Sequence, residues 1–107
     1  MDLSALSAIS PVDGRYGNKT ASLRPVFSEF GLIKYRLIVE VRWLQQLAAN
    51  PAIGEVRALS SDANAVLEAL ISNFDEVGAQ KVKDIEATTN HDVKAIEYFI
   101  KDAISGN

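Results

Sequence analysis

The stretch "SEFGLIKYRLIVEVRWLQQLAAN", from Ser28 to Asn50, decides the fold class. Its apolar residues recur at the spacing of one helical face. They are Ile33, Leu37, Val41, Leu44 and Ala48. Pro51 follows directly, and proline cannot continue the hydrogen-bond ladder of a helix. Since the length and the period both exclude a strand, we predict one long helix here.

Other apolar residues of this stretch lie outside that face. Leu32, Val39 and Trp43 widen the apolar surface of the predicted helix beyond a narrow stripe. A helix that is apolar around much of its circumference is usually covered by more than one neighbour. We therefore expect this helix to pack on more than one side.

The segment before the long helix is short and rich in turn residues. A short helix is expected within residues 17–27, with Thr20 or Ser22 as its N-cap. Pro25 would end or kink it, because a proline removes a backbone donor and clashes with the preceding turn.

Three further helices are expected after Pro51. Residues 60–74 begin with good cap residues and continue with one apolar face, residues 75–89 are less periodic, and residues 90–104 again have one apolar face. The cap residues of the first segment are Ser60, Ser61 and Asp62. We find no repeat, low-complexity tract or interior linker, so we predict an all-α, compact multi-helix chain with one domain over residues 1–107.

Composition excludes several classes of function. The 107 residues carry a net charge of −3, with the charges scattered, which argues against a nucleic-acid binder because such proteins show a basic stripe. There is no cysteine and only one histidine, so disulfides, thiol nucleophiles and Cys- or His-rich metal sites are excluded. No signal peptide and no membrane-length apolar run is recognisable. We expect a soluble cytoplasmic protein without a membrane or nucleic-acid partner.

The stretch "TTNHDVKA", residues 88–95, is the first candidate for chemistry. Thr89 and Asp92 have capping-box spacing, with Asn90 as an alternative cap, and either choice puts His91 and Asp92 in the first turn of the last helix. Backbone N–H groups are unpaired there and the helix dipole is positive, which suits a phosphate or a carboxylate. The alternative is that His91 is only a surface residue at a helix start.

The stretch "SPVDGRYG", residues 10–17, is the second candidate. It places Arg15 and Tyr16 between Gly14 and Gly17, directly after a turn. The glycines would let the backbone approach a ligand, while Arg15 supplies a forked donor and Tyr16 a hydroxyl. The alternative is a surface salt bridge and a packed aromatic ring. Neither stretch alone identifies a function.

Taken in order, three stretches carry a resemblance: "SPVDGRYG", "EFGLIKYRLIVEVRWLQQLA" and "TTNHDVKAIEYFI". Together they resemble the adenylosuccinate lyases of bacterial type, within the fumarase/aspartase/argininosuccinate lyase superfamily, over essentially the whole chain. The resemblance implies the all-α N-terminal domain alone, without the long central helical bundle and the C-terminal helical domain. It also implies a homotetramer for the full-length protein.

The resemblance implies an activity and a set of site residues. The family eliminates fumarate from adenylosuccinate to give AMP, and from succinylaminoimidazole carboxamide ribotide in purine synthesis, with no metal or organic cofactor. By motif match, Arg15 and Tyr16 would contact the phosphate of the nucleotide. Asn90, His91 and Asp92 would line the same substrate site, with His91 in a binding and orienting role.

The resemblance also places the central chemistry elsewhere. A second histidine and a base serine on a mobile loop should lie beyond Asn107, so this chain is expected to hold no catalytic acid/base pair and to be inactive alone. Two other hypotheses stay open. One is a superfamily lyase of the argininosuccinate type, against which the Arg-Tyr pair argues. The other is a stand-alone helical interaction module that binds a partner through Leu32, Val39 and Trp43.

Overall fold

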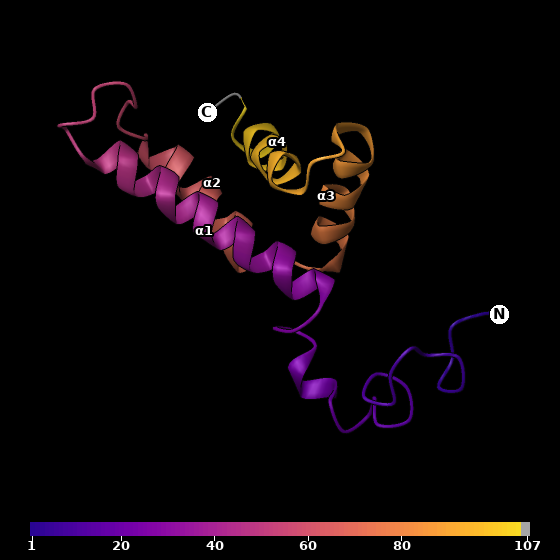
Figure 1. Cartoon of the computed structure of the whole chain (residues 1–107). Helices are drawn as coiled ribbons and strands as arrows, with labels where there is room; N and C mark the ends of the chain where they lie inside the picture. Colours follow the sequence, from indigo (N-terminus) through magenta and orange to yellow (C-terminus); the bar gives the residue numbers. More distant parts are fainter. Residues whose placement is uncertain (106–107) are drawn as a thin grey trace. The chain divides into compact units, whose positions relative to one another are not determined.

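The computed structural model describes residues 1–105, which are built from helices and turns. The elements are the single 3₁₀ turn η1 (Ala21–Leu23) and the helices α1 (Glu29–Ala49), α2 (Ser61–Ser72), α3 (Glu76–Thr89) and α4 (Asp92–Ile104) (Figure 1). No strand occurs within residues 1–105. The prediction of an all-α fold is confirmed.

Side-chain caps begin two of the helices, and one of them was among the expected cap residues. The Oγ of Ser60 accepts a hydrogen bond from the Ala63 N–H at 3.0 Å, so the first of the three cap candidates is the N-cap of α2. Asp75 caps α3 in the same way, with its Oδ1 accepting from the Gly78 N–H at 2.9 Å. Each cap satisfies one of the backbone donors that have no partner in the first turn. α1 ends shortly before Pro51, as predicted.

The chain divides into two compact units, Met1–Leu32 and Ile33–Asn107, each with its own internal contacts. The prediction of a single domain over residues 1–107 stays a prediction.

The first unit consists mainly of turns. Arg24 donates from its Nη2 to the Gly17 carbonyl at 2.9 Å, and the Thr20 hydroxyl donates to the Val12 carbonyl at 3.1 Å. The expected short helix is present only as η1, and it ends before Pro25. Thr20 does precede η1, but its side chain makes no cap hydrogen bond to the helix, because the hydroxyl is directed to the preceding turn.

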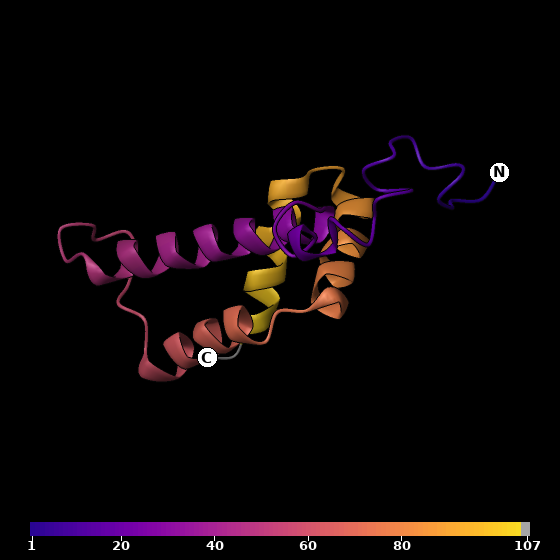
Figure 2. The ribbon, with the colours of Figure 1, turned by 90° about the horizontal axis from the view of Figure 1, so that it is seen from below.

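The second unit is held by side chains that are excluded from solvent. α4 packs against both α3 and α2, as Figure 2 shows. All four helices contribute fully buried side chains; the largest are Leu37, Val41, Leu67, Val82 and Ile96. The predicted face of α1 is confirmed, since Ile33, Leu37, Val41 and Ala48 are buried and Leu44 is half-buried. Burial of this apolar surface is the main stabilising term of the unit.

An ion pair joins α1 to α2 at the surface. The guanidinium of Arg42 meets the carboxylate of Glu68 with both of its terminal nitrogens, and the second contact, Nη2 to Oε2, is 3.2 Å long. The Arg42 hydrogen bond, followed by one from Gln45, lowers the pKa of Glu68. An exposed pair of this kind fixes orientation more than it adds stability.

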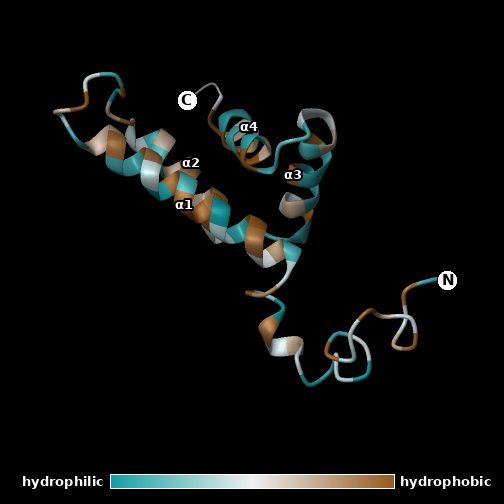
Figure 3. Cartoon of the chain, viewed as in Figure 1, coloured by the Kyte–Doolittle hydropathy of each residue, from teal (hydrophilic) through white to brown (hydrophobic). Residues whose placement is uncertain are grey.

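The second apolar face of α1 is not covered by the described chain. Figure 3 shows hydrophobic residues recurring along the length of this helix. Val39 is 64% exposed, Trp43 is 61% exposed and Leu32 is 46% exposed. The prediction that α1 packs on more than one side is therefore wrong for residues 1–105. Periodicity identifies which faces are apolar, but it does not say which of them has a neighbour.

Candidate functional site

His91 begins α4 and uses its own side chain as the N-cap. The residue has extended backbone angles, φ −145° and ψ 112°, and its Nδ1 accepts a hydrogen bond from the Lys94 N–H at 3.1 Å. The capping box predicted from Thr89 and Asp92 is therefore wrong. Thr89 is still the last residue of α3, and its Oγ1 accepts from the His91 N–H at 3.3 Å.

Asn90 is not a helix N-cap either. It ends α3 in the left-handed conformation, with φ 52° and ψ 29°, and its N–H donates to the Glu86 carbonyl at 2.8 Å. Left-handed residues commonly end helices, and asparagine tolerates this conformation better than most residues other than glycine. The sequence carried this signal, because an asparagine followed directly by a new helix start is typical of such a junction. Since Asn90 is the C-cap of α3, the next residue, His91, is the N-cap of α4.

The cap hydrogen bond determines what the His91 ring can offer to a ligand. Nδ1 accepts from a backbone N–H, so it carries a lone pair and the proton of the neutral ring lies on Nε2. The side chain is 63% exposed. His91 therefore presents an N–H donor at a helix start, where the partial positive charge of the dipole also attracts anions.

Asp92 is the first residue of α4, and its carboxylate is held by two partners. Oδ1 accepts from the Val93 N–H at 2.8 Å, and Oδ2 lies 2.7 Å from the Nη1 of Arg36 on α1. The Val93 hydrogen bond is the largest cause of a lowered pKa for Asp92, and the positive charge of Arg36 adds to it. Arg36 could not be predicted as part of this site from the sequence. Its partner lies more than fifty positions away, and only the packing of α1 near α4 brings the two together.

Arg15 and Tyr16 lie in the first unit, in the turn after residues 10–14. The Arg15 guanidinium lies over the Tyr16 ring, 5.2 Å from its centroid, which is the geometry of a cation–π contact. The Tyr16 N–H donates to the Pro11 carbonyl at 2.8 Å, which anchors the backbone of the turn. Tyr16 is 42% exposed, so part of the ring faces solvent.

Gly14, which precedes Arg15 and Tyr16, was expected to let the backbone approach a ligand, but it has a different role. A Cβ at Gly14 would lie 2.8 Å from the Ala5 carbonyl oxygen, a distance that real Cβ atoms do not show. Gly14 is therefore required for close packing of the turn against residues 5–10. This internal contact accounts for the glycine without a ligand, so the expected reason for its presence is corrected.

The five predicted residues fall into two groups. Asn90, His91 and Asp92 are adjacent at the junction of α3 and α4, while Arg15 and Tyr16 belong to the other unit. That both groups line one substrate site stays a prediction.

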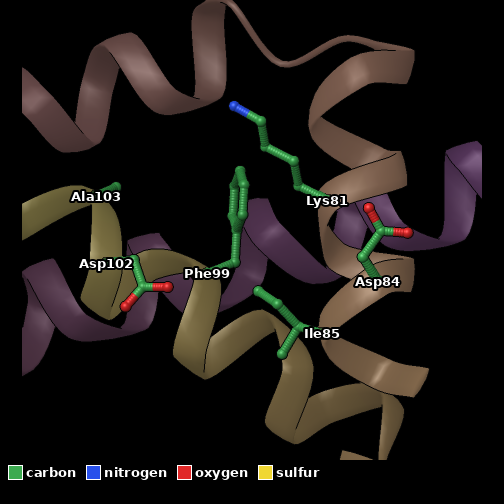
Figure 4. A pocket seen from close by; sticks show the side chains of 6 residues that line it. All are labelled: Lys81, Asp84, Ile85, Phe99, Asp102 and Ala103. Atoms are coloured by element: carbon green, nitrogen blue, oxygen red, sulfur yellow. The ribbon is translucent and has the colours of Figure 1, made fainter. Parts of the chain in front are cut away.

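A hollow of about 460 Å³ lies between α3 and α4, away from the predicted residues. Its lining is Lys81, Asp84, Ile85, Phe99, Asp102 and Ala103. Figure 4 shows the lysine and the two carboxylates pointing in different directions around the Phe99 ring. Since its charged groups do not converge, this hollow has no arrangement for chemistry. Within residues 1–105, no cluster of three or more potential metal ligands occurs, and no helix is long and apolar enough to cross a membrane.

Comparison with known proteins identifies the class. No family model matches the chain. The chain is 62% identical over 105 residues to the adenylosuccinate lyase of Vibrio cholerae (strain O395), covering 98% of this chain and 23% of that protein. It is 57% identical over 105 residues to that of Escherichia coli (strain K12), with the same coverage. It is 57% identical over 107 residues to that of Legionella pneumophila (strain Corby), covering 24% of that protein.

An all-helical chain with such relatives along nearly its whole length is homologous to lyases. More narrowly, the sequence is similar to the N-terminal part of the adenylosuccinate lyases along nearly its whole length, as the resemblance predicted. The chain spans about a quarter of the length of the curated relatives that it matches, 23% of two of them and 24% of the third.

Proposed function

We propose that this chain forms the substrate-binding N-terminal part of an enzyme that eliminates fumarate from adenylosuccinate to give AMP, and from succinylaminoimidazole carboxamide ribotide. The observation that carries the proposal is the similarity to adenylosuccinate lyases along 98% of the chain. The junction of α3 and α4 supports it, because His91 directs a hydrogen-bond donor from a helix start that attracts anions.

In the proposed site, five side chains bind and orient the nucleotide. Arg15 and Tyr16 contact its phosphate, and Asn90, His91 and Asp92 line the same site. A guanidinium suits a phosphate because its planar N–H groups can donate in pairs. The Nε2–H of His91 would donate to an anionic oxygen of the substrate. Nδ1 is already occupied by the Lys94 N–H, which leaves Nε2 as the ring nitrogen for the ligand.

The proposed reaction is a β-elimination. A base removes a proton from the carbon next to a carboxylate of the succinyl group, the C–N bond breaks, and an acid protonates the departing nitrogen. Such a step needs a positioned base and stabilisation of the developing negative charge. His91 and Arg15 do not supply both. The resemblance implies that a further histidine and a serine outside this chain carry the proton transfers. We therefore expect the chain to be inactive alone.

The resemblance also implies an oligomeric state, a cofactor requirement and a location for the proposed enzyme. We infer a homotetramer, no metal or organic cofactor, and a cytoplasmic location for the full-length protein. The argininosuccinate type of reaction is disfavoured, because a substrate without a phosphate has less need of the Arg15–Tyr16 donor pair.

A chimera tests the proposed function directly. The chain would replace the matching N-terminal segment of the Escherichia coli enzyme, to which it is 57% identical over 105 residues. Release of fumarate from adenylosuccinate would then be compared with the parent enzyme. We expect turnover by the chimera and none by the chain alone. A chimera that assembles like the parent but releases no fumarate would contradict the proposal.

Two substitutions in the chimera test the phosphate contact. Arg15→Ala should lower kcat/KM strongly while leaving thermal stability almost unchanged, because the Arg15 side chain is exposed and its contact is with the neighbouring Tyr16 ring. Lys19→Ala is the matched control, since it removes an exposed positive charge from the same turn region. Equal losses in the two variants would mean that Arg15 acts only through general electrostatics.

A further inference from the structure

An ion pair links Arg36 of α1 to the candidate site. Its Nη1 lies 2.7 Å from the Oδ2 of Asp92, and its side chain is only 29% exposed. Arg42, six residues further along α1, makes a comparable pair with Glu68. Its side chain is 49% exposed, and its partner is far from the α3–α4 junction in sequence. The two arginines therefore offer a matched comparison.

The Arg36 contact reaches the backbone of α4 through Asp92. The other oxygen of that carboxylate accepts from the Val93 N–H at 2.8 Å. The next backbone donor, the Lys94 N–H, is taken by the Nδ1 of His91 at 3.1 Å. Two successive N–H groups of one helical turn thus hold the side chains of Asp92 and His91. The ion pair with Arg36, which holds the Asp92 side chain from outside α4, therefore also restrains the first turn of α4, and this turn orients the His91 ring.

Charge gives Arg36 a second effect on the same site. The Asp92 Oδ1 lies 4.0 Å from the His91 Nδ1, so a carboxylate stands beside the ring that is proposed to meet an anion. An unpaired carboxylate would repel a phosphate or a carboxylate of the substrate. The guanidinium of Arg36 offsets this charge at short range.

We propose that Arg36 is a positioning residue of the candidate site: its ion pair with Asp92 fixes the first turn of α4, orients the His91 ring and offsets the carboxylate beside it. This inference rests on the proposed function for the nature of the ligand. The orientation of the ring is a property of the chain itself and can be measured without turnover.

The first test uses the 107-residue chain and nuclear magnetic resonance. The ring nitrogen signals of His91 report its tautomer, and hydrogen exchange of the Lys94 amide reports the cap. We expect Arg36→Met to change both, with the ring signals moving toward a mixture of tautomers and the Lys94 amide exchanging faster. Arg42→Met should change neither. Unchanged His91 and Lys94 signals in the Arg36→Met chain would overturn the proposal, and so would equal changes in both variants.

The second test separates binding from chemistry in the chimera described above. Because Arg36 acts through Asp92, Arg36→Met should raise KM for adenylosuccinate about two- to fivefold, the range for a partly exposed ion pair, with little change in kcat. Arg36→Lys should restore most of the loss, since a single donor meets Oδ2. In an Asp92→Asn background, Arg36→Met should have no further effect. If Arg36→Met raises KM as much in the Asp92→Asn background as it does with Asp92 present, the proposal is overturned.

The two failures can be told apart. If the unsubstituted chimera does not release fumarate, the proposed function fails, while the magnetic resonance comparison still decides whether Arg36 positions His91. If the chimera is active and Arg36→Met is silent in both tests, the positioning role fails alone.

Discussion

Replacing His91 by alanine and by asparagine separates the two roles of its side chain. Nδ1 accepts the Lys94 N–H at 3.1 Å and so caps α4, while Nε2 is the nitrogen proposed to donate to the substrate. Alanine removes both roles. Asparagine is among the most favourable N-cap residues and its side-chain oxygen can take over the cap, but it has no imidazole. The pair of variants therefore distinguishes a stability effect from a binding effect.

The size of each effect follows from the geometry. Losing an N-cap acceptor costs about 1 kcal/mol, within a range of roughly 0.5–2 kcal/mol. For a chain of this size, that lowers Tm by about 4–8 °C. His91→Ala should show this loss, and His91→Asn should match or exceed the stability of the unsubstituted chain. Removing a hydrogen bond to a charged group costs about 1.5–3 kcal/mol, so both variants should lose about tenfold to 150-fold in kcat/KM.

The assays are thermal and urea unfolding of the chain, followed by circular dichroism, and fumarate release by the chimera. The stability comparison requires that the unfolding transitions be two-state and coincide between probes. If His91→Ala and His91→Asn are equally destabilised, the cap assignment is wrong. If His91→Asn retains full activity, the imidazole is not part of the substrate site.

Three further outcomes follow from the fold of the second unit. Because Asn90 has φ 52°, Asn90→Ala should destabilise the chain by about 1 kcal/mol while Asn90→Gly should not, as measured by urea unfolding. Leu67 is fully buried, so Leu67→Ala should cost about 2–5 kcal/mol, whereas Val39→Ala on the exposed face of α1 should change stability by less than about 0.5 kcal/mol. The fold lowers the pKa of Asp92 and of Glu68 below their ordinary values of 3.8 and 4.5. The contribution of these two carboxylates to stability is therefore fully present above about pH 4.5, and it should be lost as the pH falls through their lower folded pKa values. Acid titration followed by circular dichroism would detect this loss.

Much of the helical fold could be predicted because its signals are local. The apolar period of α1 identifies the buried face, from Ile33 to Ala48, and Ser60 caps α2 because a serine oxygen before a helical run can meet a free backbone donor. The junction of α3 and α4 was harder. Several polar residues compete there to end one helix and begin the next, and the left-handed Asn90 decides the outcome.

The parts of the site that could not be predicted depend on contacts distant in sequence. The role of Arg36 depends on its ion pair with Asp92, and no local pattern in the sequence of α1 indicates this partner. The sequence around Gly14 predicts access for a ligand, yet the lack of a side chain at Gly14 is required by the carbonyl of Ala5. The local sequence of a glycine next to polar residues is the same whether the glycine gives access to a ligand or packs against another part of the chain. Only the position of the neighbouring backbone distinguishes an internal contact from a ligand contact.

The identity of residue 91 is itself an argument about function. The cap explains why the ring lies where it does, but it does not explain why the residue is histidine, because asparagine, aspartate, serine and threonine all cap helices better. A position chosen for stability alone would carry one of those residues. What histidine adds is a second ring nitrogen that stays available when the first one is occupied by the backbone. We propose that the weaker cap is retained because it holds an N–H donor at the start of α4, and the activity of the His91→Asn variant tests this.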